Sequence, residues 1–341
     1  VLKVRCVLLL IRLLERMELP FLFHKGTYTL SPDLQSMKGL RIAVMTSVMQ
    51  MLKISVVVLC VLAFAKAHSQ GTDLFRAEYT YFPQSKSDNS FRRFRTFANV
   101  PLKVDDGTYV VPFLEYRNVE YIVKDDFTLT DFGSDRYESY EVGLGYTFPM
   151  KNNWRFGARI GILVASNFDE GRAKSDDYFL TGSFYFIKSK KNREDGGKPW
   201  RLIVGVQYAT TAGRPFPLPY LNYYREMNDS WSFTLGAPKM NLKYRFNEKN
   251  NMQLYARLDG FYANIQNDEP TSRGVAEDVS MTVAMIGPGY EYNFTKHISA
   301  YIYTGYTFIN DIRLRDNNGD DVVTLNDTST FYSRIGLKFK I

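Results

Sequence analysis

The last eleven residues of the sequence alternate between two kinds of side chain. Because successive side chains of a β-strand point to opposite sides, this segment forms a strand with one apolar and one polar face. An apolar face that ends flush with the C-terminus is typical of the strand that closes a transmembrane β-barrel. We therefore predict an all-β chain that forms a single antiparallel barrel closed by this strand. The apolar face holds Phe331, Ile335, Leu337, Phe339 and Ile341, and the polar face holds Tyr332, Arg334, Lys338 and Lys340.

The same two-residue rhythm runs from Gln70 onward, in segments separated by turn residues. Short turns such as Asp105-Asp106-Gly107 alternate with longer polar loops such as 315–327, which is the layout of outer-membrane barrels. A single-chain barrel takes an even number of strands, so the sequence predicts about fourteen, with 231–246 as a hairpin and twelve as the fallback. The strands are expected at about 73–82, 91–104, 108–124, 136–148, 154–164, 178–188, 200–208, 220–226, 231–236, 240–246, 252–265, 279–294, 298–314 and 328–341.

A secreted β-sandwich is the alternative fold, because its strands alternate as well. Segment 213–219 is not expected to be a central strand of either fold, since its three prolines donate no ladder hydrogen bonds. Strand length and aromatic side chains near strand ends favour the barrel, because such aromatics form girdles at the membrane interfaces. These aromatics are Tyr81, Phe148, Trp154, Trp200 and Tyr208.

The basic sequence pI of about 9.1 comes from the front of the chain. Residues 1–69 hold nine of the 43 basic and three of the 36 acidic side chains, so the remainder carries 34 and 33. A nearly neutral remainder gives no reason to expect a nucleic-acid partner. Both cysteines, Cys6 and Cys60, also lie at the front, which excludes disulfides, thiolate metal sites and a cysteine nucleophile in the rest.

Segment 51–69 has the pattern of a secretory signal peptide. Lys53 precedes an apolar run at 54–64, and the small residues Ala67 and Ser69 precede a cleavage site before Gln70. The apolar run is too short to cross a bilayer as a helix. Residues 70–341 would then form the barrel in the outer membrane of a Gram-negative bacterium, with membrane lipid and the barrel-assembly machinery as partners.

Residues 1–50 are expected to be an extension without function, upstream of a true translation start at Met45, Met49 or Met51. The alternative is a cytoplasmic or membrane anchor, because 1–19 is rich in leucine and isoleucine.

Three stretches resemble a pattern in a known family. They are PYLNYY at 219–224, WSFTLGAP at 231–238 and LKYRF at 242–246. The pattern is similar to that of the DUF6268 group, a family of uncharacterised outer-membrane β-barrels of Bacteroidetes type, and the resemblance covers most of 70–341. It implies a barrel in the outer membrane, and it brings no established activity to carry over. Ile341 departs from the aromatic residue usual at the end of such barrels.

Catalytic chemistry has little support in the sequence. His297 is the one histidine after Gln70, and we expect it in a solvated turn rather than as a general base. Gly-x-Ser-x-Gly, His-Glu-x-x-His and phosphate-loop motifs are absent. The sequence therefore predicts no catalytic residue, no cofactor and no enzyme.

An acidic segment at 316–321 resembles half a calcium loop through Asp316, Asn318 and Asp320. Its glycine, Gly319, stands at the fourth position, whereas a calcium loop requires glycine at the sixth. We expect a flexible surface loop there and no metal site.

Sixteen charged side chains fall on the inward face of the predicted strands. A charge facing lipid would cost about 2–4 kcal/mol at mid-membrane, so these residues are expected to face the lumen. Twelve basic and four acidic side chains could form a basic lumen that favours anions, or a network of ion pairs that braces a closed barrel. The sequence predicts a passive pore or small-solute transporter with a basic lumen; the alternative is a non-conducting structural or secretion-accessory barrel. The residues are Arg76, Glu78, Arg93, Arg95, Glu115, Arg117, Glu141, Arg155, Arg159, Arg201, Lys243, Arg245, Arg257, Asp259, Arg334 and Lys338.

Overall fold

The computed structural model describes residues 73–83, 90–122, 136–190, 197–271 and 273–340. All of them belong to one compact unit, Cys60–Ile341. The predictions for 1–50, for the signal peptide at 51–69 and for both cysteines lie outside the described residues. Within those residues, no helix has the length and apolar character needed to cross a membrane.

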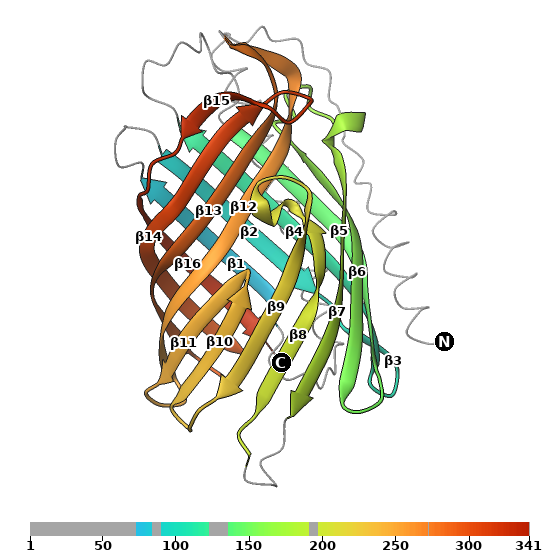
Figure 1. The fold of residues 1–341 in the computed structure, drawn as a ribbon, viewed down its shortest axis with the longest axis vertical. Coiled ribbons are helices and arrows are strands. Elements are labelled where there is room, and N and C mark those ends of the chain that lie inside the picture. The colour runs from blue at the N-terminus through green and yellow to red at the C-terminus, as the bar shows by residue number, and fades with distance from the viewer. Residues whose placement is uncertain (1–72, 84–89, 123–135, 191–196, 272, 341) are drawn as a thin grey trace, which may run out of the picture. The chain divides into compact units, whose positions relative to one another are not determined.

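The described chain consists of β-strands and two single-turn 3₁₀ helices (Figure 1). The helices are η1 (Ser175–Asp177) and η2 (Thr210–Ala212). The strands are β1 (Asp73–Pro83), β2 (Ser90–Asn99), β3 (Leu102–Asp105), β4 (Thr108–Ile122), β5 (Arg136–Pro149), β6 (Trp154–Ser166), β7 (Tyr178–Lys190), β8 (Trp200–Ala209), β9 (Phe216–Glu226), β10 (Trp231–Ala237), β11 (Lys239–Arg245), β12 (Asn250–Thr271), β13 (Gly274–Asn293), β14 (Ile298–Arg315), β15 (Asp321–Asn326) and β16 (Phe331–Lys340).

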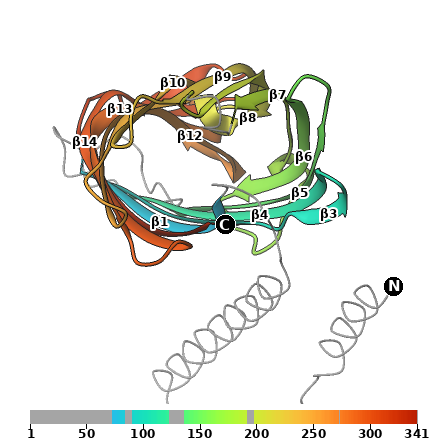
Figure 2. The ribbon, with the colours of Figure 1, turned by 90° about the horizontal axis from the view of Figure 1, so that it is seen from below.

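Fourteen strands form a closed antiparallel ring, as predicted (Figure 2). Each strand of the ring pairs with the ring strand that follows it in the chain. β16 closes the ring by pairing with both β1 and β14. β3 pairs with β4 alone and β15 with β14 alone, so neither strand is part of the ring. β10 and β11 form the hairpin expected for 231–246, since Phe233 faces Leu242. The first and last strands meet at the Asp73–Lys340 pair, at the end that carries the turns 150–153, 227–230, 246–249 and 294–297. This end is called the short-turn end below, and the opposite end is called the long-loop end.

Several strands differ from their predicted bounds. β12 continues to Thr271 although it was expected to end at 265, β13 begins at Gly274 rather than 279, and β15 lies inside the loop expected at 315–327. The strand expected at 91–104 is divided at Pro101 into β2 and β3, because proline has no amide hydrogen for the ladder. β9 begins at Phe216, inside the proline-rich segment, although the strand was expected from 220. Pro217 and Pro219 pair with β8 on one side, whereas pairing with β10 begins only at Leu221. The prolines therefore lie where β9 has a single neighbour.

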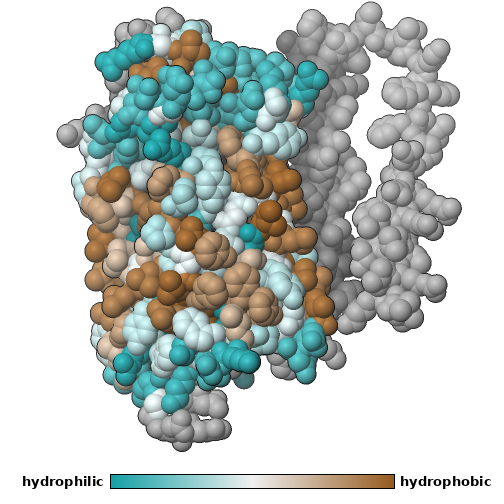
Figure 3. All heavy atoms as spheres, turned by 45° about the vertical axis from the view of Figure 1, so that its right-hand side comes forward, coloured by the Kyte–Doolittle hydropathy of each residue, from teal (hydrophilic) through white to brown (hydrophobic). Residues whose placement is uncertain are grey.

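The outer face of the ring is apolar around its middle. On β5 the exposed side chains are Tyr140, Val142, Leu144 and Tyr146, and the intervening residues point into the lumen. Figure 3 shows a hydrophobic belt between two hydrophilic ends. Alternation along the strands thus separates an outer face suited to lipid from a face that points into the lumen.

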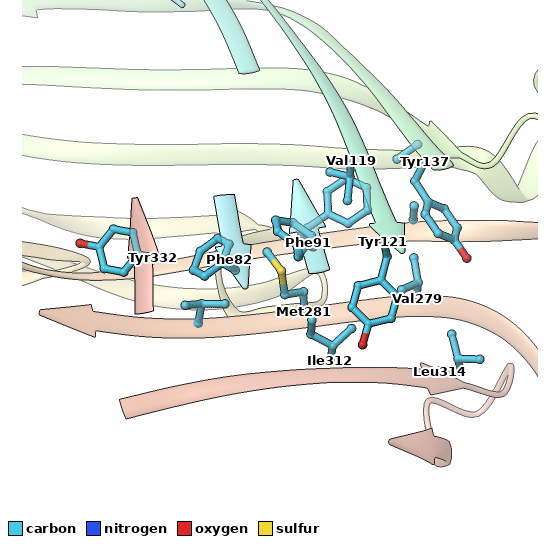
Figure 4. Packing of buried hydrophobic residues seen from close by; sticks show 14 of the residues in the cluster. Phe82, Phe91, Val119, Tyr121, Tyr137, Val279, Met281, Ile312, Leu314 and Tyr332 are labelled. Carbon is cyan, nitrogen blue, oxygen red and sulfur yellow. The ribbon is translucent and has the colours of Figure 1, made fainter. Parts of the chain in front are cut away.

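An apolar cluster fills the lumen toward the long-loop end (Figure 4). Strand β12 leaves β11 here and meets the end of β6, where Asn264 pairs with Ser166. This contact narrows the ring and brings side chains of β12 and β13 against those of β1, β2, β4 and β5. A void of about 10 Å³, room for roughly one water molecule, lies inside the cluster. The cluster, called the apolar plug below, includes Phe82, Phe91, Val119, Tyr121, Tyr137, Phe261, Val279, Met281, Ile312 and Leu314.

Candidate functional site

Asp259 on β12 lies at the centre of the charged lumen. It accepts two hydrogen bonds from Arg93 on β2, at 2.6 and 3.2 Å, and one from Arg334 on β16, at 2.8 Å. Both guanidinium groups are 1% exposed. A buried carboxylate requires such partners, because neither charge retains its water. This one side chain therefore connects three strands that are remote in sequence.

Glu78 on β1 forms the next part of the network. Tyr301 donates its hydroxyl hydrogen to Glu78 Oε2 at 2.6 Å, and Arg95 approaches Oε1 at 3.5 Å. Arg334 lies 3.9 Å from the same carboxylate and donates from Nε to Thr80 Oγ1 at 2.9 Å. Arg334 thus joins the Glu78 and Asp259 carboxylates.

Glu115 on β4 binds Arg95 as well, together with Arg117. Arg95 donates from Nε and Nη2 at 3.0 and 2.8 Å, and Arg117 donates from Nε to the same carboxylate. Arg257 approaches Asp259 at 3.8 Å, and Arg76 pairs with Asp73. Nine of the predicted inward residues therefore meet in one network: Arg76, Glu78, Arg93, Arg95, Glu115, Arg117, Arg257, Asp259 and Arg334.

A second cluster lies nearer the short-turn end, around Glu291 on β13. Lys243 binds its carboxylate at 2.7 Å, and Lys338 also contacts it. Glu291 was not among the predicted lumen residues, although the alternation of strand 279–294 places it on the inward face. Tyr301 was missed as well, and its inward position on β14 could have identified it. Asp73 was also missed, and alternation could not have identified it, because the register of β1 shifts between Asp73 and Phe75.

Four predicted residues stand apart from both clusters. Glu141 accepts a hydrogen bond from the Thr181 hydroxyl at 2.7 Å, and Arg155 donates to the Gly107 carbonyl oxygen at 2.6 Å. Arg201 and Arg245 are exposed near the ends of β8 and β11. The structure thus brings most, but not all, of the predicted charges together.

Arg159 on β6 is the remaining predicted residue, and its surroundings differ from those of the other lumen arginines. Its guanidinium carbon lies 3.8 Å from the centre of the Phe113 ring, and no carboxylate of the described strands lies within ion-pair distance. Two glycines make room for the ring, because a Cβ at Gly143 or Gly161 would lie 2.5 or 2.9 Å from Phe113 Cζ. The residue is exposed to the lumen. Arg159 therefore offers a positive charge that forms no ion pair within the described strands, in a cavity that the carboxylates of Glu115 and Glu141 also line.

Two cavities meet at Arg159. One has a volume of about 220 Å³ and reaches η2 and the tip of the β10–β11 hairpin at Pro238. The other has a volume of about 260 Å³ and extends toward Asp73 and Asn99 at the short-turn end. Arg95, Phe113, Glu115 and Arg159 line both. Arg159 and Phe113 therefore stand at the boundary between two polar spaces within the lumen.

A family comparison covers most of this barrel. Residues 128–340 match the family described as a domain of unknown function, DUF6268. The chain belongs to the DUF6268 family. This agrees with the resemblance found in 219–246. The family match includes Glu141, Arg159 and Asp259, whereas Arg76 to Arg117 precede it. None of the curated proteins compared with this DUF6268 member matches it.

Several solved outer-membrane proteins are similar to this DUF6268 barrel at low identity. LpxR from Salmonella typhimurium is 8% identical, with a TM-score of 0.38, over 78% of this chain and all of that one. An outer membrane channel from Pseudomonas putida F1 is 6% identical, with a TM-score of 0.39, over 81% and 98%. The NanC porin is 13% identical, with a TM-score of 0.32, over 78% and 100%.

The acidic segment at 316–321 forms a compact turn in this DUF6268 member. Asp316 Oδ1 accepts hydrogen bonds from the backbone amides of Asn318 and Asp320, at 3.0 and 2.8 Å. Its carboxylate therefore caps the turn, and the described residues contain no group of three or more metal-ligating side chains. His297 lies in the turn before β14, where its Nδ1 is 3.0 Å from the Lys340 carbonyl oxygen. Neither segment borders the lumen cavities.

Proposed function

We propose that this DUF6268 member is an integral barrel of the Gram-negative outer membrane that admits small anionic solutes to a basic lumen. The observation that carries the proposal is Arg159 at the boundary of two lumen cavities, a charge that no carboxylate of the described strands pairs with. The surrounding network has an excess of positive charge as well, because six arginines face the carboxylates of Asp73, Glu78, Glu115 and Asp259. A wetted basic wall favours anions over cations.

The apolar plug defines how such passage would be controlled. Its described side chains pack around a void of about 10 Å³, so an ion crossing to the long-loop end would have to pass an apolar constriction. Ions pass apolar constrictions poorly, because they dewet. We therefore propose a solute transporter whose plug must rearrange, rather than a permanently open pore. Membrane lipid would surround the belt, and the barrel-assembly machinery would insert the chain.

Replacing Arg159 with glutamine is expected to reduce the preference for anions. Removal of one positive charge changes the energy of an anion 4 Å away by at least about 1 kcal/mol, which corresponds to roughly a fivefold change in relative permeability. The measurement is the reversal potential of the purified protein in a planar bilayer under a potassium chloride gradient. The control is Arg201→Gln at the end of β8, which removes the same charge outside both cavities. Equal selectivity of R159Q and the unchanged protein would contradict the proposed role.

Electrophoretic mobility tests whether the protein is an integral membrane barrel. We expect the purified protein to keep a fast mobility in SDS until it is boiled, because ladder hydrogen bonds hold each strand of the closed ring to two neighbours. The comparison is the same sample before and after boiling. A protein that dissolves without detergent, with one mobility, would instead be a soluble β-protein.

A non-conducting structural barrel is the second candidate. The bridged carboxylates and the apolar plug favour it, because both brace the wall from inside. Absence of any conductance in the planar bilayer, at every voltage tested, would favour this role over transport.

A further inference from the structure

The wall of the barrel is interrupted beside the β10–β11 hairpin. This hairpin has seven residues in each strand, whereas β9 has eleven and β12 has 22. Pairing of β10 with β9 ends at Leu221, and pairing of β11 with β12 ends at Arg257. Toward the long-loop end, β9 and β12 therefore present edges to one another across the hairpin tip at Pro238.

The edge of β9 that faces the interruption has no backbone N–H donor at positions 217 and 219. Glu226 donates its amide hydrogen to Pro199, on the β8 side, so the even-numbered amides of β9 point toward β8. The odd-numbered amides point toward the interruption, and there positions 217 and 219 are both proline. An unpaired amide facing lipid would cost several kcal/mol, and proline removes it. This edge can therefore stay unpaired in an apolar environment.

The edge of β12 is covered by a turn rather than a strand. Asp259 Oδ1 accepts the amide hydrogen of Gly260 at 3.0 Å, and η2 packs against the glycine. A Cβ at Gly260 would lie 2.5 Å from the Thr210 carbonyl oxygen, so only glycine allows this approach. Thr282 holds the same turn by donating to the Ala212 carbonyl oxygen at 3.0 Å. One turn with a few contacts thus separates this side of the wall from the cavity.

The cavity behind the turn is the one that Arg159 borders. Thr210, Thr211 and Pro238 line it. Four arginines against three carboxylates give its lining an excess of one positive charge: Arg95, Arg117, Arg159 and Arg257 against Glu115, Glu141 and Asp259. Outside, the neighbouring exposed side chains are apolar: Phe216, Leu221, Leu235 and Met240. An apolar surface on one side of a single turn and a basic cavity on the other match the two ends of an anionic amphiphile.

We propose that the donor-free edge of β9, the hairpin tip and η2 form a lateral portal between lipid and the basic lumen. The proposal rests on the proposed function and extends it: the solute is an amphiphile with a carboxylate or phosphate head. The head occupies the 220 Å³ cavity, which is smaller than the roughly 300–1,000 Å³ of sites that enclose drug-sized ligands. The hydrocarbon chain therefore remains among the apolar side chains outside.

Thiol labelling tests the portal. The full chain with Cys6→Ser and Cys60→Ser receives one new cysteine, Ser183→Cys, which lines the cavity, and is reconstituted in phosphatidylcholine liposomes. The matched control is Thr147→Cys, which faces the lumen near Arg155 at the short-turn end. Each variant is treated with N-dodecylmaleimide, which partitions into lipid, and with a sulfonated water-soluble maleimide. Mass spectrometry follows both reactions.

For each reagent, the quantity compared is the rate of S183C modification divided by the rate of T147C modification. We expect this ratio to be larger for N-dodecylmaleimide than for the water-soluble maleimide. Dodecanoate should protect S183C, dodecyltrimethylammonium should not, and Arg159→Gln should abolish the protection. Equal rate ratios for the two reagents would overturn the portal, and equal protection by the cation would overturn the anionic head. If the protein conducts anions selectively but N-dodecylmaleimide shows no preference for S183C, the lateral portal is contradicted and the proposed anion passage is not. If S183C is labelled from the lipid and protected by dodecanoate but the protein does not conduct, the proposed ion passage is contradicted and the lateral portal is not.

Discussion

Replacing Asp259 with alanine is expected to lower the free energy of unfolding by about 3–5 kcal/mol, because it leaves buried guanidinium groups without a counter-charge. Arg93 and Arg334 are each 1% exposed and both bind this carboxylate. Arg257 has Asp259 as its nearest carboxylate, at 3.8 Å. Thermal unfolding in detergent, followed by the loss of heat-modifiable mobility, measures the effect.

Glu141→Gln is the matched control for this prediction. Glu141 is also a lumen carboxylate, but it accepts one hydrogen bond, from the Thr181 hydroxyl, and forms no ion pair in the described strands. An amide oxygen can accept that bond, so the loss should stay within about 1 kcal/mol. If D259A and E141Q unfold at the same temperature, the network around Asp259 does not brace the barrel.

A double-mutant cycle separates the pair from the rest of the network. Arg93→Met removes the guanidinium that donates two bonds to Asp259, while Arg334 still holds the carboxylate. Because D259A already removes the partner of Arg93, R93M in that background should cost less than it does alone. The coupling energy expected for such contacting groups is roughly 0.5–3 kcal/mol.

The strand count and the inward charges could be predicted because both follow from local rules. A charge that faces lipid is expensive, so Arg93 and Asp259 had to point inward wherever the rest of the barrel lay. The hairpin at 231–246 followed from the even number of strands. These rules act within one strand or between neighbouring strands, and alternation in a single sequence is enough to show them.

The partners of those charges could not be predicted in this way. Arg93 and Asp259 are 166 residues apart, and their bond depends on how β12 crosses the closed ring. Glu291 was omitted although its strand was expected, because alternation was not carried through to every inward position. The sequence could count the lumen charges, but only the ring shows which of them neutralise each other and that Arg159 has no carboxylate partner in the described strands.

The apolar plug was also missed, although its signal is present in the strands. On β1 the inward face runs from Glu78 through Thr80 to Phe82, and on β4 it runs from Arg117 to Val119. Inward side chains thus change from charged to apolar toward the long-loop end. Alternation alone assigns each residue to the inner or the outer face. It does not show how far along the barrel axis the residue lies, and the plug is defined by that position.

Opening the plug is expected to produce the largest functional change. Phe261 on β12 is 1% exposed and faces Met281 on β13 across one ladder position, so both fill the same level of the lumen. Phe261→Ala should cost about 3–5 kcal/mol of stability, yet an apolar void of this kind stays dry and blocks ions. Adding Met281→Asn places a polar group in the void. We therefore expect F261A/M281N, and not F261A, to show sustained conductance in a planar bilayer.

The control for this pair is Phe308→Ala, which removes the same ring from the lipid-facing side of β14, where it is 59% exposed. That change leaves the plug intact and should leave conductance at the level of the unchanged protein. Residues 259 and 260, next to Phe261, line the 220 Å³ cavity, so a wetted void at this level joins the plug to the basic lumen. The conductance should therefore be anion-selective and should lose that selectivity with R159Q. A conducting F261A/M281N that prefers cations would show that the network arginines, paired as they are, do not set the potential along the path.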